Sequence, residues 1–209
     1  MSVKRPYSSA KRQAQARETR RAILDAAYQL FVANGYAATT IQAIAEGAGV
    51  AVQTVYAVFG NKRELLRQLI EVTITGDDEP EPITERAEAL AVAAEPDARR
   101  RAELDAAMSR SITERVAPII RVVGEAAASD PELAAMMEAV KAARREEMIT
   151  SATIVAGPDG LSVDVDEAAA TLYVIYSPQV ADMLMRDYGW SAERYEQWLA
   201  RMILATVIA

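Results

Sequence analysis

The sequence predicts an all-α protein in two parts, an N-terminal domain of short helices and a larger helical body. Apolar residues recur at the spacing of one helix face along most of the 209 residues. Gly, Pro and capping residues divide the chain into segments of ordinary helix length. No segment has the alternating pattern of a strand, and no internal repeat is evident.

The composition excludes several classes of enzyme. The chain has no Cys and no His, which excludes disulfides, thiol nucleophiles, Ser-His-Asp triads and His-metal sites. Carboxylate, Lys or Tyr chemistry is left open, although no local motif demands it. We therefore expect no catalytic residues, no metal and no cofactor.

The hydropathy of the chain predicts a cytoplasmic protein that does not bind membranes. No run of about 18 apolar residues exists that could span a bilayer. The basic N-terminus is followed by no uninterrupted apolar segment of the kind that secretory signals contain.

Charge divides the chain into two. Residues 1–70 hold ten basic and four acidic side chains, a balance of +6, whereas the remainder holds 13 basic and 26 acidic ones, a balance of −13. Such asymmetry indicates a polyanion-binding head on an acidic body, although a solvated basic tail alone would account for part of it.

The N-terminal part reads as three short helices followed by a longer one. A first helix is expected over residues 18–34, where Gly35 stops it, because Gly reaches the left-handed conformation without a steric penalty. Thr39 with Gln42 predicts the capped start of a second helix, which Gly49 ends. A third helix starts at Ala51 or Val52, so the spacing is that of a helix-turn-helix.

The third helix is expected to have a slim outer face. Val55 and Phe59 fall on its inner side, while Gln53, Thr54 and Ala57 point away. A helix with so short an exposed face suits the major groove of DNA. Asn61 with Glu64 then predicts the capped start of a helix over 62–75.

This N-terminal part resembles the TetR family of transcriptional repressors over about residues 20–66. The matching elements are ILDAAYQLFVANGY, TTIQAIAEGAGV, TVYAVF and NKREL, in that order and with the expected spacing. The resemblance implies a basic flexible arm (1–17), a DNA-binding domain with its connecting helix (18–75) and a helical domain for ligand binding and dimerisation (76–209). Departures from the family pattern are Ala51 at the cap of the third helix and Val58 on its flank.

The resemblance also implies the roles of individual residues. Thr39 or Thr40, Tyr56 and Lys62 would contact the phosphate backbone, as helix N-termini and cations do. Val52, Gln53, Thr54 and Ala57 would face the bases, with Gln53 able to bond adenine and the small apolar groups able to pack on thymine methyls. The basic residues of the arm could enter an adjacent minor groove; they are Lys4, Arg5, Lys11, Arg12 and Arg17.

The body is expected to contain seven helices, near 84–94, 97–115, 117–129, 131–156, 164–176, 178–188 and 191–208. Adaptable Met side chains and two Tyr hydroxyls could line a pocket for a small apolar ligand, although the same residues are most often plain core. The candidate pocket residues are Met108, Ile112, Ile119, Met136, Val140, Met148, Tyr173 and Tyr176.

The last two segments, roughly 164–188 and 191–208, are strongly apolar for the end of a chain. The core of a single monomer could also bury these apolar residues. In the TetR family the last two long helices form a four-helix bundle across a two-fold axis. The resemblance therefore implies a homodimer whose interface includes Leu172, Met183, Trp198, Leu199, Met202 and Ile203.

Together these features predict a homodimeric repressor that binds a palindromic double-stranded DNA operator containing A·T steps and is released by a small-molecule effector. One alternative is a regulator without a small-molecule ligand, either constitutive or controlled by a protein partner. A carboxylate- or Tyr-based enzyme is the other, and it would need a cleft with converging ionisable groups.

Overall fold

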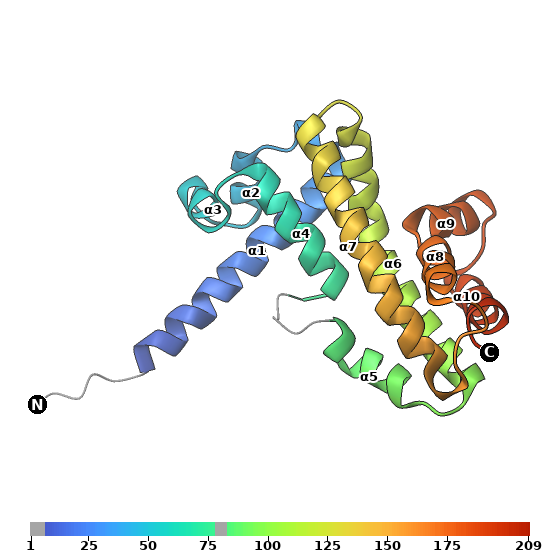
Figure 1. Cartoon of the computed structure of the whole chain (residues 1–209). Coiled ribbons are helices and arrows are strands. Elements are labelled where there is room, and N and C mark those ends of the chain that lie inside the picture. Colours follow the sequence, from blue (N-terminus) through green and yellow to red (C-terminus); the bar gives the residue numbers. More distant parts are fainter. Residues whose placement is uncertain (1–6, 78–82) are drawn as a thin grey trace, which may run out of the picture. The chain divides into compact units, whose positions relative to one another are not determined.

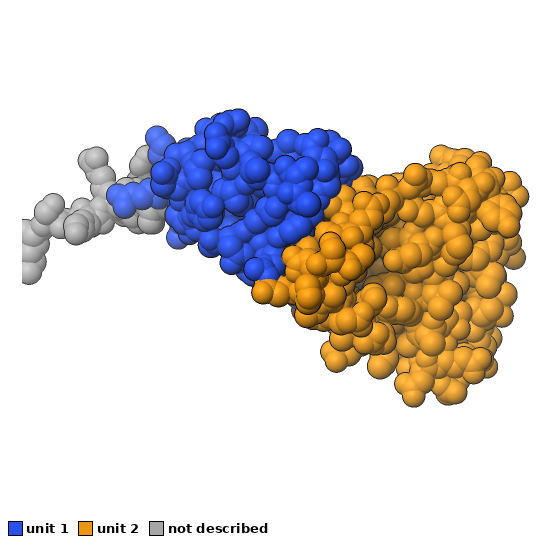
Figure 2. All heavy atoms as spheres, turned by 90° about the horizontal axis from the view of Figure 1, so that it is seen from above, with its two compact units in different colours: residues 1–72 blue, residues 73–209 orange. Residues whose placement is uncertain are grey.

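The computed structural model describes residues 7–77 and 83–209, with side chains from residue 11 onward. These residues form ten α-helices and short 3-10 or π-helical turns, and the strand-type pairing among them is one isolated bridge between Leu161 and Ile208 (Figure 1). The chain divides between Val72 and Thr73 into two compact units, coloured separately in Figure 2. Within the described part, no helix combines the length and apolarity needed to cross a bilayer.

The first unit contains α1 (Tyr7–Ala38), α2 (Ile41–Gly47), α3 (Val52–Phe59) and most of α4 (Lys62–Thr75). The helical face expected from the sequence is buried, with Ile23, Ala27 and Phe31 of α1 fully excluded from solvent. Gly35 interrupts α1 with a φ of 78°, a left-handed value that disfavours other residues. The expected stop at this residue is confirmed.

The start of α1 differs from the expectation of a flexible arm before residue 18. The helix begins at Tyr7, so residues 7–17 are helical. This segment is rich in Ala, Gln, Lys and Arg, which have high helix propensity, and it continues a helix that is already nucleated by its packed part.

The second unit contains α5 (Ala87–Ala94), α6 (Ala98–Ala127), α7 (Pro131–Ala156), α8 (Val165–Ile175), α9 (Pro178–Asp182) and α10 (Ala192–Thr206). A 3-10 turn (Ile83–Glu85) precedes α5, another (Gly157–Asp159) follows α7, and a π-helical turn (Met183–Asp187) extends α9. The side chains of Asp130, Asp164, Ser177 and Ser191 accept backbone N–H groups of the helices that follow, and so cap α7, α8, α9 and α10.

The expected break near Pro118 is wrong, because α6 runs through this residue without ending. Proline in a helix interior removes one hydrogen bond and costs about 3 kcal/mol. Val116, Ile119, Val122 and Val123 on both sides of it are nevertheless buried. Their burial, at roughly 1.5–3 kcal/mol for each large apolar side chain, outweighs the local cost.

Arg101 joins the start of α6 to the end of α7, although its side chain is fully buried. Its Nε donates to the Val155 carbonyl at 2.6 Å and its Nη2 to the Ala156 carbonyl at 2.7 Å, and it pairs with Asp159. Gly157 leaves room for it, since a Cβ there would lie 2.8 Å from the guanidinium carbon. A cation at a helix C-terminus also stabilises the helix dipole.

We expect Arg101→Ala to lower the free energy of unfolding of the second unit by about 3 kcal/mol or more, because buried carbonyls lose their donors. Trp190 and Trp198 are the two tryptophans of the chain and both lie in this unit, so urea unfolding followed by their fluorescence measures the effect. The matched control is Arg145→Ala on the exposed side of α7, which should change stability by no more than about 0.5 kcal/mol. Equal, small effects of both substitutions would contradict this role of Arg101.

Candidate functional site

The outer face of α3 is exposed as the sequence predicts. Val55 and Phe59 are buried, while Gln53, Tyr56 and Ala57 are exposed. Val52 and Thr54 are half-buried at the edges of this face. We call the face formed by Gln53, Thr54, Tyr56 and Ala57 the α3 face.

The two threonines expected to contact phosphate have different roles at the start of α2. Thr39 is buried, and its hydroxyl donates to the carbonyls of Leu30 at 3.1 Å and Gly35 at 2.8 Å. Thr40 is the actual cap and is exposed, with its hydroxyl accepting the Ala43 N–H at 3.0 Å. The expected cap at Thr39 is therefore wrong, and its side chain serves the turn between α1 and α2.

Lys62 also has a structural role that its sequence position did not indicate. Its ammonium donates to the carbonyls of Tyr36 and Thr39, both at 2.9 Å, and lies 4.1 Å from the centre of the Tyr36 ring. Partial burial lowers the pKa of the ammonium below its ordinary value. The start of α4 is thereby tied to the turn that leads into α2.

The basic residues expected in the arm fall into two groups. Lys4 and Arg5 lie outside the described residues. Lys11, Arg12 and Arg17 are exposed on the N-terminal part of α1, and they are held by a helix instead of a flexible segment.

The residues expected to line a pocket do not form one set, although Met148, Tyr173 and Tyr176 share the main core of the second unit. Ile119, Met148 and Tyr176 are buried in the packed interior, where Met148 and Tyr176 belong to the main core of the second unit. Met136, Val140 and Tyr173 are half-buried. Met108 and Ile112 line a hollow elsewhere in the unit. The assignment of the eight residues to a ligand pocket stays a prediction.

This hollow, of about 240 Å³, lies at the C-terminal end of α4. Besides Met108 and Ile112, apolar and charged side chains from four parts of the chain line it. These parts are the end of α4 with the residues after it, the turn before α5, α5 itself and α6, and they contribute Ile74, Asp77, Ile83, Arg86, Glu88 and Arg115. Arg86 and Asp77 form a double hydrogen bond with both distances at 2.8 Å. Sequence reasoning missed these charged residues because no local pattern links them.

Arg115 of α6 binds the last carbonyls of α4. Its Nε donates to Thr73 and its Nη2 to Ile74, both at 3.3 Å, while its Nη1 donates to the Ser111 hydroxyl at 2.8 Å. Burial, helped by the like charge of Arg86, lowers the pKa of Arg115. The wall of the hollow therefore includes the side chain that holds the end of α4.

The residues expected at a dimer interface are partly internal. Leu172, Leu199 and Ile203 are 0 % exposed within a single chain, so they offer no surface to a second copy. The apolar stripe of α10 packs on α6 and α8 of the same unit. Trp198 and Met202 are half-buried, and Met183 is exposed.

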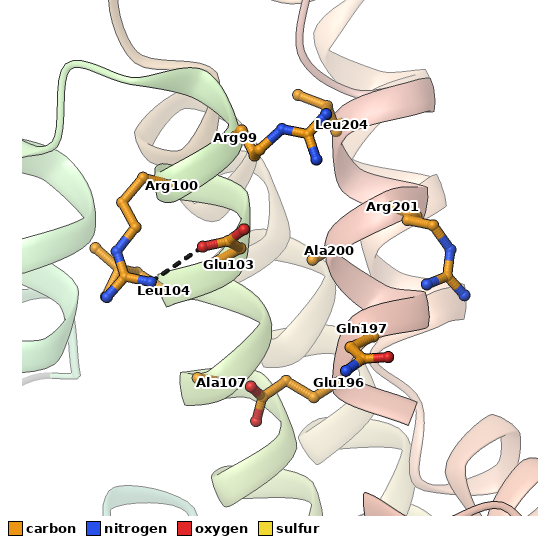
Figure 3. Close-up of a pocket in the computed structure, with 10 residues that line it drawn as sticks. All are labelled: Arg99, Arg100, Glu103, Leu104, Ala107, Glu196, Gln197, Ala200, Arg201 and Leu204. Atoms are coloured by element: carbon orange, nitrogen blue, oxygen red, sulfur yellow. Dashed lines mark hydrogen bonds and ion pairs between the residues drawn. The ribbon is translucent and has the colours of Figure 1, made fainter. Parts of the chain in front are cut away.

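An open groove of about 580 Å³ runs between the outer faces of α6 and α10 (Figure 3). Its apolar lining consists of Leu104, Ala107, Ala200 and Leu204. Figure 3 places Arg99 beside Leu204 at one end and Glu196 beside Ala107 at the other. This groove did not follow from the sequence, because it depends on how the two helices pack.

A buried polar stripe on α6 was also missed. Arg101, Asp105, Ser109 and Thr113 recur every four residues, and all are buried. Asp105 accepts a hydrogen bond from the Tyr176 hydroxyl, and burial raises the pKa of Asp105 to about 6. The spacing of these residues places them on one face of α6, but a polar face of a helix is usually exposed to solvent.

Comparison with known proteins agrees with this architecture. Residues 23–69 match the family described as bacterial regulatory proteins, tetR family. A segment of 54 residues is 48% identical to an uncharacterized HTH-type transcriptional regulator, YvkB, of Bacillus subtilis, and covers 26% of this chain and 29% of that relative. The match thus spans less than a third of the relative's length.

Two solved structures are similar over nearly the whole chain. A putative TetR-family transcriptional regulator from Rhodococcus sp. has a TM-score of 0.69 at 17% identity, covering 90% of this chain and 98% of that one. The transcriptional regulator FadR from Bacillus subtilis, in complex with stearoyl-CoA, has a TM-score of 0.65 at 20% identity, covering 88% and 96%. Residues 23–69 are therefore a DNA-binding domain of the TetR family, and the chain as a whole has the fold of these regulators.

Proposed function

We propose that this protein is a cytoplasmic, DNA-binding repressor that acts as a homodimer on a palindromic operator and is released by a small molecule. The observation that carries the proposal is the exposed α3 face, on a helix fixed from behind by buried Val55 and Phe59. Gln53 offers the amide that pairs with adenine, and Ala57 a small apolar contact for thymine methyls.

Phosphate contacts are proposed for Thr40, Tyr56 and Lys62. Thr40 and Tyr56 are exposed on either side of the turn between α2 and α3. Lys62 is half-buried and uses its ammonium to hold the carbonyls of Tyr36 and Thr39. Its ammonium lies at the Thr39 carbonyl, just before the start of α2, so it can position the domain on DNA while stabilising it.

The proposed route from effector to DNA is α4. This helix begins at Lys62, which holds the turn before α2, and it ends at carbonyls bound by Arg115 in the wall of the 240 Å³ hollow. A ligand that displaces Arg115 or the Arg86–Asp77 pair would shift the end of α4. A typical coupling of about 1 to 3 kcal/mol is enough to weaken operator binding, and by reciprocity DNA weakens effector binding equally.

The volume of the hollow supports a small effector. About 240 Å³ lies below the roughly 300–1,000 Å³ of most drug-sized ligand sites. Ile74, Ile83, Met108 and Ile112 favour an apolar body, and the charged rim favours a polar end group. A similar fold binds stearoyl-CoA in FadR, which supports ligand binding by the helical unit of such a fold.

A regulator without an effector is the second candidate, because Ile119, Met148 and Tyr176 are packed where a larger pocket was expected. An enzyme is less well supported. The Asp105–Tyr176 pair has perturbed pKa values, but both side chains are buried among core residues, which gives a substrate no access.

For the dimer, we propose that a second copy packs on the groove between α6 and α10. The groove combines an apolar floor with arginine at one end and glutamate at the other. A two-fold axis across it would place the arginine end of one copy near Glu196 of the other, which also pairs with Arg110 of its own chain at 2.7 Å. Small Ala107 and Ala200 allow close approach of the helices.

Gln53→Ala should reduce the preference for operator over random duplex, by about 1–3 kcal/mol for the lost base contact. Lys62→Ala should weaken binding to both duplexes alike, since a phosphate contact carries no sequence information. An operator is first selected from a library of random duplexes. Fluorescence anisotropy at one salt concentration then gives the ratio of the affinity for this operator to the affinity for random duplex. The control is Gln29→Ala on the exposed side of α1. A Gln53 variant with the wild-type ratio would remove the α3 face from the proposal.

Ala200→Arg should dissociate the dimer, because it places a large charge on the floor of the groove. Static light scattering at micromolar concentration measures the mass. Val174→Arg, at an exposed position on α8, is the matched control and should remain dimeric. Dissociation by the Val174 substitution alone would place the interface elsewhere, and a monomeric wild type would exclude palindrome binding by a preformed dimer.

Ile112→Trp should fill the hollow and abolish effector response while operator affinity is kept. A fragment library is screened for compounds that release the operator from the wild type, and those compounds are then titrated against the variant. Ile149→Trp on the exposed side of α7 is the control and should respond like the wild type. If the Ile112 variant were still released by the same compounds, the effector site would lie outside this hollow.

A further inference from the structure

A chain of side-chain contacts joins α4 to α1 and α3 within the first unit. Arg20 of α1 donates from its Nη1 to the side-chain oxygen of Gln68 in α4 at 2.5 Å. The same guanidinium lies over the ring of Phe59, the last residue of α3, with its carbon 5.1 Å from the ring centre. The side chain of Arg20 therefore contacts both of the other helices at once.

The α4 end of this chain of contacts is held in place by further hydrogen bonds. Gln68 donates to Glu64 at 2.5 Å, and Arg67 donates to the two carboxylate oxygens of Glu64 at 2.6 and 2.9 Å. These hydrogen bonds from Arg67 and Gln68 lower the pKa of Glu64 to about 2, so its carboxylate is ionised at neutral pH. The amide of Gln68 is thereby fixed on α4 and moves with this helix.

The α3 end of the chain of contacts lies directly behind the α3 face. Phe59 is 3 % exposed and, with Val55, forms the buried side of α3. A cation within about 6 Å of the centre of an aromatic ring is attracted to the face of that ring. The position of the Arg20 guanidinium therefore affects the end of α3, and with it the orientation of Gln53 on the opposite side.

The apolar packing of α4 does not provide the same directional coupling. Leu66 and Leu69 of α4 are buried, but the stabilisation from such burial depends on the area removed from water and has no preferred direction. A hydrogen bond, in contrast, weakens steeply when its distance or angle changes. A small shift of α4 that the leucines tolerate is therefore enough to break the bond between Arg20 and Gln68.

We propose that Arg20 is a positioning residue for DNA recognition, which transmits shifts of α4 to the end of α3. With α4 in place, the Gln68 oxygen holds the guanidinium over Phe59, and α3 keeps its orientation. When α4 shifts, the guanidinium loses this acceptor and the end of α3 loses its support. Arg20 acts in this way through Phe59, without contacting DNA itself. This inference rests on the proposed function of the α3 face and on α4 as the route from effector to DNA.

The first test follows Phe59 in the free, full-length protein. The chain has two phenylalanines, Phe31 and Phe59, so incorporation of para-fluorophenylalanine gives two fluorine NMR signals, which a Phe31→Leu variant assigns. Gln68→Leu should shift the Phe59 signal, because the guanidinium loses its acceptor. In an Arg20→Met background, the same Gln68 substitution should cause no further shift.

The matched control for this test is Gln179→Leu at an exposed position of α9, which should move neither signal. A Phe59 signal that Gln68→Leu leaves at the wild-type position would overturn the proposal. A shift that is equally large with and without Arg20 would do the same, because α4 would then act on α3 by another path.

The second test separates positioning from direct contact with DNA. Arg20→Met and Gln68→Leu should each lower the ratio of operator affinity to random-duplex affinity by about tenfold, the loss for one disturbed base contact. The double variant should be no worse than either single variant, because both remove the same interaction. Additive losses would contradict the shared role.

The salt dependence of binding distinguishes the two roles of an arginine. Both single variants should keep the wild-type slope of log K against log salt, whereas a lost phosphate contact would lower the magnitude of this slope by about 0.9. A lower slope for Arg20→Met, together with wild-type behaviour of Gln68→Leu, would make Arg20 a phosphate contact and overturn the positioning role.

Loss of folding and failure of the proposed function give different results. A variant that is only less stable binds both duplexes less, in proportion to its folded fraction, and keeps the wild-type affinity ratio; this result for Arg20→Met would also overturn the proposal. A wild type that binds no duplex would refute the proposed function. The fluorine signals of the free protein would still show whether Arg20 couples α4 to α3.

Discussion

Cations from neighbouring helices bind the carbonyls at helix ends, and the packing of both units depends on these contacts. Within the described residues, no helix from α1 to α10 has a basic residue in its own last turn. Arg101 of α6 binds the end of α7, and Arg144 of α7 donates to the Tyr173 carbonyl near the end of α8 at 2.7 Å. The negative ends of the α7 and α8 dipoles are thus balanced only when these helices are assembled with their neighbours. This makes helix termination a tertiary property, since a shifted helix would expose both the cation and the carbonyls.

The same principle holds α4 at its two ends. Lys62 at its start donates to carbonyls of the turn between α1 and α2, and Arg115 of α6 donates to the carbonyls of Thr73 and Ile74 at its end. The Arg115 contacts are long, at 3.3 Å, and hydrogen bonds of this length are weaker than those near 2.9 Å.

The sequence predicted what is encoded locally. Gly35 ends the packed part of α1, Asn61 and Asp164 cap the helices that follow them, and Val55 and Phe59 turn inward. Each of these depends on residues within four positions along the chain, where spacing alone specifies the contact. Thr39 and Thr40 mark the limit of this reasoning. Both can cap α2, and the choice of Thr40 follows from the burial of Thr39 between carbonyls that lie further back in α1 and its turn.

Periodicity identifies a buried face but not the surface that buries it. Leu199 and Ile203 have the spacing of an interface helix, yet α6 of the same chain already covers them. The apolar pattern also gives no sign that Asp105 and Ser109 are buried, and Asp105 is satisfied there by the hydroxyl of Tyr176 at the end of α8. In both cases the deciding partner lies more than 60 residues away, outside any local window. A site built from such contacts, including the hollow at the end of α4 and the groove on α10, becomes visible only when the helices are placed together.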